Sequence, residues 1–329
     1  MPQWFAAILI RGAICKKGML CILRLFRANR DCIDVPDWIP RFIVLLEDLH
    51  ELGIVNSVLS LMLGFASHQP NSVVCLVPAV VALVHKLAVK RTCPSDYLYY
   101  SVPCPWVQVK CLRFLQYFRV RDYDYEALEM LFETLRKLLS RDKPSEIANK
   151  NNANHAILFE AINLVIAFGN DAPEDLHDHV MDHLGRFVGV KDANIRYLSL
   201  DAMTRMTRTD IRGPLRAQPY QSVVMDSVRD GDISVKKRAL DLIFALVDEN
   251  NAEVLVGELV VCLVSAQTAI KEEMVIKIAI LAERFSAQTS WYVKLIIGVR
   301  YFLFVFLIFV SFLLKQVCGY PCSLHTCCW

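Results

Sequence analysis

The stretch DISVKKRALDLIFALVDE, residues 232–249, decides the fold of this chain. Its apolar residues fall three or four positions apart, the spacing of one face of an α-helix. They are Val235, Ala239, Leu240, Leu242, Ile243 and Leu246. The basic run Lys236–Arg238 lies on the other side, and the small Ala239 suits the close approach of a second helix. The stretch therefore predicts an amphipathic helix that packs against a neighbouring helix.

The same pattern recurs along the chain. Each copy has a branched anchor residue followed, four, five, seven and eight positions later, by mostly apolar or small residues. The anchors are Ile14, Ile54, Val107, Ile157, Ile195, Val235 and Ile270, at intervals of 40, 53, 50, 38, 40 and 35 residues. A period near 40 residues built from helix pairs is typical of HEAT and armadillo repeats. Because one pair cannot bury its own apolar side, each repeat is stabilised by stacking on the next. We expect residues 1–293 to form an all-α solenoid of the HEAT/armadillo type, a superhelix.

Two irregular segments account for the long intervals. TCPSDYLYYSVPCPW, residues 92–106, contains three prolines and forbids a regular helix. Arg141–Asn154 is the most polar part of the chain and is predicted to be a loop. Within the predicted helix Val73–Val89, Pro78 should either kink the helix or mark its first turn.

Composition narrows the class of protein. A chain of 329 residues would ordinarily suggest two domains, but a solenoid has no single core to outgrow. The formal net charge of +2 argues against binding of a polyanion by the whole chain, though not against a local basic patch. Eight of the twelve cysteines are scattered, and Cys21, Cys111 and Cys262 lie in apolar stripes, which is typical of reduced cysteines in a cytosolic protein. The first fourteen residues are interpreted as part of the first helix rather than as a targeting peptide.

The C-terminal end has a different character. Residues 294–315 include LIIGVRYFLFVFLIFVSFLL, residues 295–314, which is long enough to span a bilayer. Arg300 lies near one end, where its charge can reach the membrane surface. We interpret this segment as an apolar helix, either a transmembrane helix or an aberrant tail. Residues 316–329 form a Cys-rich tail without CxxC spacing; a zinc site or acylation is less favoured there than an unstructured tail.

A histidine-rich helix is the main candidate for chemistry. In DLHDHVMDHL, residues 175–184, His179 and His183 are four positions apart, as in a helical metal pair. The glutamate of an HExxH motif is absent, and the histidines flank the apolar stripe, which favours a solvated helix face. The sequence also lacks a glycine-rich phosphate loop and a nucleophile elbow. We therefore predict no catalytic, cofactor-binding or metal-binding residues and no enzyme; a metal-dependent enzyme using His179 and His183 is the minor alternative.

Two basic groups remain as candidate contact sites. Lys16, Lys17, Arg24, Arg27 and Arg30 make the first repeat basic. The run Lys236–Arg238 does the same in a later repeat. Either group is consistent with a solvated face or with contact to lipid phosphates or to an acidic partner.

Five segments of the chain are long and specific in sequence: YLYYSVPCPWVQVKCLRFLQYF (97–118), NKNNANHAILFEAINLVI (149–166), NIRYLSLDAMTRM (194–206), DISVKKRALDLIFALVD (232–248) and IKEEMVIKIAILAERFSAQTSWYV (270–293). They closely resemble the alpha-adaptin trunk, part of a large subunit of adaptor protein complex 2, the plasma-membrane clathrin adaptor. Their sequence is most similar to the plant form. The family chain is much longer, so no lipid or cargo residues are carried over. After residue 293 this chain departs from the trunk pattern, which suggests a partial or alternatively spliced gene model.

The resemblance implies a scaffold in clathrin-dependent endocytosis and intracellular protein transport. It implies partners as well: the beta, mu and sigma chains of the adaptor, clathrin and cargo indirectly, and a membrane phosphoinositide, but no nucleic acid. The implied location is cytoplasmic, peripheral at the plasma membrane and the clathrin-coated pit. If residues 295–314 insert into a bilayer, the alternative is a membrane-anchored helical-repeat scaffold.

Overall fold

A computed structural model describes residues 12–140 and 146–285, together with residues 291, 293, 295 and 297. The chain divides into two compact units. The first comprises Met1–Arg186 with Arg208–Arg216, and the second comprises Phe187–Thr207 with Ala217–Trp329. The predicted boundaries at 293/294 and 315/316, the apolar segment and the Cys-rich tail lie outside the continuously described residues.

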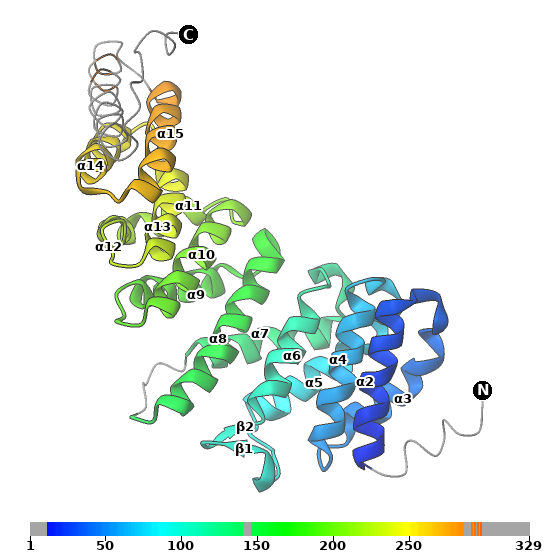
Figure 1. Cartoon of the computed structure of the whole chain (residues 1–329). Helices are drawn as coiled ribbons and strands as arrows, with labels where there is room; N and C mark the ends of the chain where they lie inside the picture. The colour runs from blue at the N-terminus through cyan, green and yellow to red at the C-terminus, as the bar shows by residue number, and fades with distance from the viewer. Residues whose placement is uncertain are drawn as a thin grey trace, which may run out of the picture. The chain divides into compact units, whose positions relative to one another are not determined.

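The first unit contains two rows of helices (Figure 1). One row, called the anchor row, consists of α2 (Gly12–Ala28), α4 (Leu52–Ala66), α6 (Pro105–Leu115) and α8 (Ala148–Phe168), each packed against the next. The other row consists of α3 (Ile39–Glu47), α5 (Val77–Ala88) and α7 (Tyr125–Leu139). The unit also contains α9 (Glu174–Val188), apart from its last two residues, most of α11 (Gly213–Ala217), and the 3-10 turns η1 (Arg30–Cys32), η2 (Pro36–Trp38), η3 (Pro70–Leu76), η4 (Ser95–Tyr97), η5 (Val120–Asp122) and η6 (Gly169–Asp171). Every helix of the anchor row carries one of the predicted anchors.

The second unit also consists of helix pairs. It contains most of α10 (Ala193–Thr209), η7 (Gln218–Tyr220), α12 (Gln221–Ser227), α13 (Ile233–Leu246), α14 (Ala252–Ser265) and α15 (Thr268–Arg284). Helix α13 packs against α12 and α15, and α14 packs against α15. Helix α13 begins at Ile233, one residue into the quoted stretch, because the Asp232 side chain accepts a hydrogen bond from Ser234 N at 2.7 Å as a helix N-cap. All six predicted apolar residues of α13 are buried. The all-α repeat fold is confirmed.

Pro78 marks a first turn. The predicted helix Val73–Val89 is divided into the 3-10 segment η3 and the helix α5. Helix α5 begins at Val77 and has Pro78 in its first turn, where a missing N–H costs nothing.

Among the residues searched, Pro70–Ala88 is the one helical stretch long and apolar enough to cross a membrane by length and composition. More than half of it is buried within the protein, as in a core helix.

The predicted register of the first helix is wrong by one residue. Ile14 is 46% exposed, whereas Cys15, Met19, Ile22, Leu23 and Phe26 are buried. The buried face that begins at Cys15 places the large Phe26 in the core. A buried face that began at Ile14 would instead place the small Gly18 there. Cys21 consequently faces solvent, which corrects its interpretation as a core residue; Cys111 and Cys262 are buried as predicted.

The predicted loop Arg141–Asn154 is too long. Helix α8 begins at Ala148, so its second half is helical. Most residues in the first two turns of α8 are polar and at least partly exposed to solvent. Ala153, in the second turn, is already buried in the core. Composition alone does not distinguish such turns from a loop.

The segment before α6 contains a small hairpin in which Leu98 pairs with Pro103 and Tyr99 with Val102. At its turn, Tyr100 and Ser101 have φ angles of 47° and 64°, a left-handed conformation that strains residues with a side chain. We expect Ser101→Gly to raise the free energy of unfolding by about 0.5–1 kcal/mol, because glycine adopts this conformation without strain. Urea unfolding measures the change. Ser95→Gly, at a position without positive φ, is the control and should not stabilise the chain.

Candidate functional site

Polar contacts join successive helices of the anchor row in the first unit. Lys110 Nζ on α6 donates to Asn56 O at 2.9 Å and to Ser60 Oγ at 2.6 Å, both on α4. Burial and the neighbouring Arg113 lower the pKa of Lys110. Arg113 Nε in turn donates to Glu160 Oε1 on α8 at 3.1 Å. These contacts fix the order and register of the stacked helices.

The second unit uses its basic run in the same way. Arg238 on α13 donates to the Tyr197 hydroxyl at 3.1–3.2 Å and lies 3.5 Å from Asp201 Oδ1, both on α10. Lys237 Nζ lies 3.9 Å from Glu273 Oε2 on α15. Two of the three residues of the run 236–238 thus have acidic partners within their own unit. The run is mainly a structural element, and its charge is largely matched.

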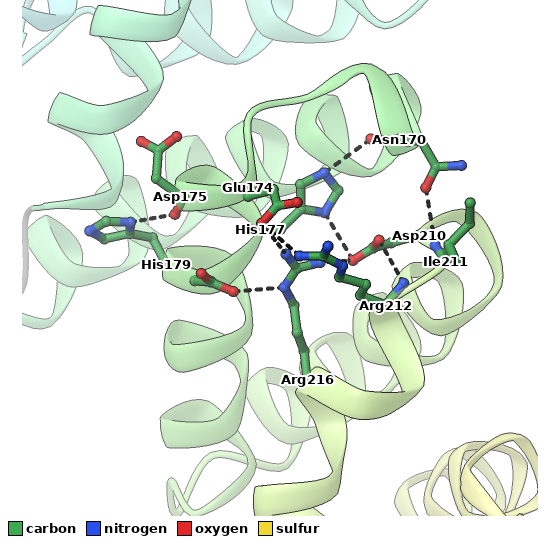
Figure 2. Close-up of polar contacts among 11 residues, drawn as sticks. Asn170, Glu174, Asp175, His177, His179, Asp210, Ile211, Arg212 and Arg216 are labelled. Carbon is green, nitrogen blue, oxygen red and sulfur yellow. Dashed lines mark hydrogen bonds and ion pairs between the residues drawn. The ribbon is translucent and has the colours of Figure 1, made fainter.

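The three histidines of α9 have different environments, and Figure 2 shows two of them, His177 and His179. His177 is 3% exposed; its Nε2 donates to the carbonyl of Gly169 at 3.0 Å, and its Nδ1 lies 3.3 Å from Asp210 Oδ2. His183 is also buried and donates from Nε2 to the carbonyl of Leu139. His179 is exposed, with Nδ1 2.5 Å from the carbonyl of Asp175. The predicted solvated face is therefore correct for His179 and wrong for the other two.

The two buried histidines serve packing. Gly169 ends α8 with a φ of +55°, which turns the chain so that its carbonyl meets His177. His183 joins α9 to the end of α7 through Leu139. His183 Nε2 is thus engaged and its Nδ1 lies 3.4 Å from Arg186 NH2, whereas His179 is exposed. Across residues 12–140 and 146–285, no group of three or more His, Cys, Asp or Glu side chains is arranged to hold a metal ion.

An ion-pair cluster fastens the chain after α10 to α9, within the first unit (Figure 2). Arg216 forms ion pairs with the buried Asp210 and, at 2.6 Å, with Asp178 Oδ1. Asp210 Oδ1 also accepts a hydrogen bond from the backbone N of Arg212 at 3.0 Å. Sequence reasoning missed Asp210 and Arg216, because no periodic pattern predicts which charged residues of a connection are buried together. The cluster is a structural fastening.

Arg136 on α7 and Asp175 on α9 form a more exposed pair, with Nε 2.6 Å from Oδ2. The hydrogen bond from Arg136 lowers the pKa of Asp175. A depressed carboxyl pKa stabilises the folded state above the unfolded pKa of about 3.9, and this stabilisation disappears as pH falls through the lower, folded-state pKa. We expect Asp175→Asn to cost up to about 1 kcal/mol at neutral pH, since the pair is partly solvated, and almost nothing near pH 2.

Urea unfolding at both pH values measures this difference. The Arg136→Ala/Asp175→Asn double variant is the control, because the cost of losing Asp175 should shrink once Arg136 is gone. An equal cost at both pH values would contradict the assignment.

A basic pocket lies at the ends of α2, α4 and α6 in the first unit. Its volume is about 420 Å³. Arg27 and Arg30 come from the end of α2 and η1, His68 from the end of α4, and Arg113 and Tyr117 from the end of α6. Of the described residues that line it, none is acidic. Of the five basic residues predicted as a group in the first repeat, the structure brings Arg27 and Arg30 into this pocket, while Lys16 Nζ lies 3.8 Å from Glu51 Oε2.

We compared the chain with protein families, with curated proteins and with solved structures. The family model described as the adaptin N terminal region matches residues 11–299. The chain is 39% identical over 288 residues to AP-2 complex subunit alpha-1 of Arabidopsis thaliana and 37% identical over 284 residues to AP-2 complex subunit alpha-2 of Dictyostelium discoideum. These matches cover 87% and 86% of this chain but 28% of each relative. The chain thus spans little more than a quarter of the length of these relatives.

A likeness to solved structures supports the fold alone. A designed armadillo repeat protein, solved in complex with the peptide (KR)4, superposes with a TM-score of 0.51 and 15% sequence identity. The superposition covers 75% of this chain and 99% of the designed protein.

Proposed function

Because this chain belongs to the adaptin N-terminal region family, we propose that it is a scaffold segment of a clathrin adaptor large subunit, acting in endocytic protein transport. The observation that carries the proposal is the 39% identity with an AP-2 alpha subunit, sustained over 288 residues rather than confined to one motif. Stacked helix pairs offer long, firmly positioned surfaces for other proteins. The scaffold holds its partners by such surfaces and needs no catalytic step.

The proposal includes partners and location. The beta, mu and sigma chains of the adaptor bind the scaffold, clathrin and cargo are linked through them, and membrane phosphoinositide is contacted at the plasma membrane. The chain then acts in the cytoplasm, at coated pits. In this proposal residues 1–293 form the adaptin trunk, residues 294–315 a separate apolar segment and residues 316–329 a short tail.

Co-expression with the adaptor beta, mu and sigma chains of the same organism tests this function. We expect the tagged full chain to co-purify with at least one of them through size-exclusion chromatography. A form ending at residue 293 retains every continuously described helix and is the comparison. If only the shortened form captures partners, the C-terminal segment blocks assembly; if neither form does, the scaffold function is refuted.

The apolar segment has its own test, because residues 295–314 are long enough to span a bilayer. In the adaptor scaffold, the full chain is released from membranes by alkaline carbonate. Resistance to carbonate that disappears in the form ending at residue 293 would instead favour the membrane-anchored scaffold.

A further inference from the structure

We propose that the basic pocket of the first unit is a binding site for an acidic peptide segment of a partner protein. The pocket gathers three guanidinium groups and an imidazole from the ends of three successive helices of the anchor row and the residues just after them: Arg27, Arg30, Arg113 and His68. This convergence depends on the fold, because Arg27 and Arg113 are 86 positions apart in the sequence.

The pocket has an excess of positive charge. Arg113 is paired with Glu160, which neutralises one of the three guanidinium groups. Within the described residues, neither Arg27 nor Arg30 has an acidic partner. Arg30 NH1 instead lies 3.2 Å from His68 Nδ1. Because a guanidinium can only donate, His68 Nδ1 is the acceptor of this hydrogen bond. An anion offers these donors a better acceptor than a neutral imidazole does.

Helix dipoles explain only part of this arrangement. Arg27 and Arg113 lie in the last turns of α2 and α6, where the partial negative charge of a helix end favours a cation. Arg30 lies beyond α2, in η1. The dipole therefore does not account for its position beside His68.

The shape and chemistry of the pocket favour a peptide carboxylate. Its volume, about 420 Å³, is within the range of small-ligand sites of roughly 300–1,000 Å³ and accommodates one or two acidic side chains. Its full cations are arginines, whose planar groups bind carboxylates through two parallel hydrogen bonds. Tyr117, which is 43% exposed, adds an aromatic wall with a hydroxyl group. A recessed site of this kind suits a side chain inserted from a partner better than the flat surface of a bilayer.

A second cavity shows the contrast. It lies between α12 and α14 in the second unit and has a volume of about 530 Å³. Asp226 and Glu258 line it together with Arg229, so its charges are mixed. Of these two cavities, only the pocket of the first unit is lined by basic residues without acidic ones, and it alone is complementary in charge to an acidic segment.

Fluorescence anisotropy of the full chain with a short, labelled Glu-rich peptide tests the proposal. We expect Arg27→Gln/Arg30→Gln to weaken binding by about tenfold or more, because two charge-assisted contacts are lost. Lys17→Gln/Arg24→Gln is the matched control, since it removes the same charge from exposed positions of α2 outside the pocket. It should change the affinity by less than about threefold at physiological salt, where distant charges are screened. A Gln-rich peptide of equal length should not bind.

Three results would overturn the proposal: equal losses in the two double variants, equal binding of the Gln-rich peptide, or an unchanged affinity of the pocket variant. Vesicles containing anionic phospholipid form a further arm. If the pocket variant loses vesicle binding while peptide binding is unaffected, the site is a membrane contact and the peptide assignment is wrong. Circular dichroism checks folding, and Arg30→Gln alone is the milder variant. Because the assay uses no adaptor subunit, its result is independent of the co-purification test.

Discussion

Asp210→Ala is expected to lower the free energy of unfolding of the first unit by about 3–5 kcal/mol, the cost of removing one partner of a buried ion pair. Asp210 is 7% exposed, and the side chain of its partner Arg216 is 12% exposed. The substitution leaves a nearly buried guanidinium with only the solvated carboxylates of Asp178 and, at 4.0 Å, Glu174 nearby. It also removes the acceptor of the Arg212 backbone N–H. His177 loses the carboxylate beside its Nδ1 as well.

Urea unfolding followed by circular dichroism measures the loss, and hydrogen exchange should locate it in α9 and residues 208–216. Glu174→Ala is the matched control. Glu174 pairs with Arg212 at 2.8 Å and lies 4.0 Å from Arg216 NH2, but its side chain is 67% exposed, so its contacts contribute less than about 1 kcal/mol. A loss for Asp210→Ala no larger than that of the control would show that the cluster does not hold this connection in place.

Phe65→Ala is the second substitution with a large expected effect, also about 3–5 kcal/mol. Phe65 on α4 is fully buried, with its ring centroid 4.7 Å from that of Phe26 on α2 and 6.2 Å from that of Phe42 on α3. It therefore joins three helices, and its removal leaves a cavity that these helices cannot fill without moving. The stacked arrangement transmits the defect chiefly to neighbouring helices.

Thermal and urea unfolding measure this effect. Val44→Ala on α3 removes apolar atoms from a residue that is 67% exposed, and it should change stability by no more than about 0.5 kcal/mol. We expect faster hydrogen exchange in α2, α3 and α4 and unchanged exchange in α13. A uniform change along the whole chain would contradict the nearest-neighbour description of the repeats.

The periodic part of the structure was predictable from the sequence. Helix α13 forms within the quoted stretch and buries the predicted face, because period and N-cap agree within one segment. The register error in α2 arose where two adjacent phases were nearly equal in apolar content, and only packing against α4 selects Cys15 over Ile14. Local pattern determines that a helix forms, whereas the neighbouring helix determines its rotation.

The polar sites were harder to predict because they depend on residues distant in sequence. The buried His183 forms its hydrogen bond with the carbonyl of Leu139, 44 positions earlier in the sequence. The basic pocket is formed by residues from three repeats. The sequence identified Arg27 and Arg30 as part of a basic group but had no means of adding His68 or Arg113. The repeat spacing predicted the architecture and the family resemblance predicted the class of function, but neither assigned these side chains.

The placement of the cysteines has a practical consequence for covalent labelling. Burial raises the pKa of Cys104 to about 11 and raises that of Cys111 still further, so both thiols resist alkylation in the folded protein. Cys21, Cys32 and Cys75 are exposed and lie within the first quarter of the chain. After serine replacement of the other accessible thiols, a maleimide dye on Cys21 would stand on the outer surface of α2. Such a dye would report the arrival of a partner on the anchor row without disturbing the core.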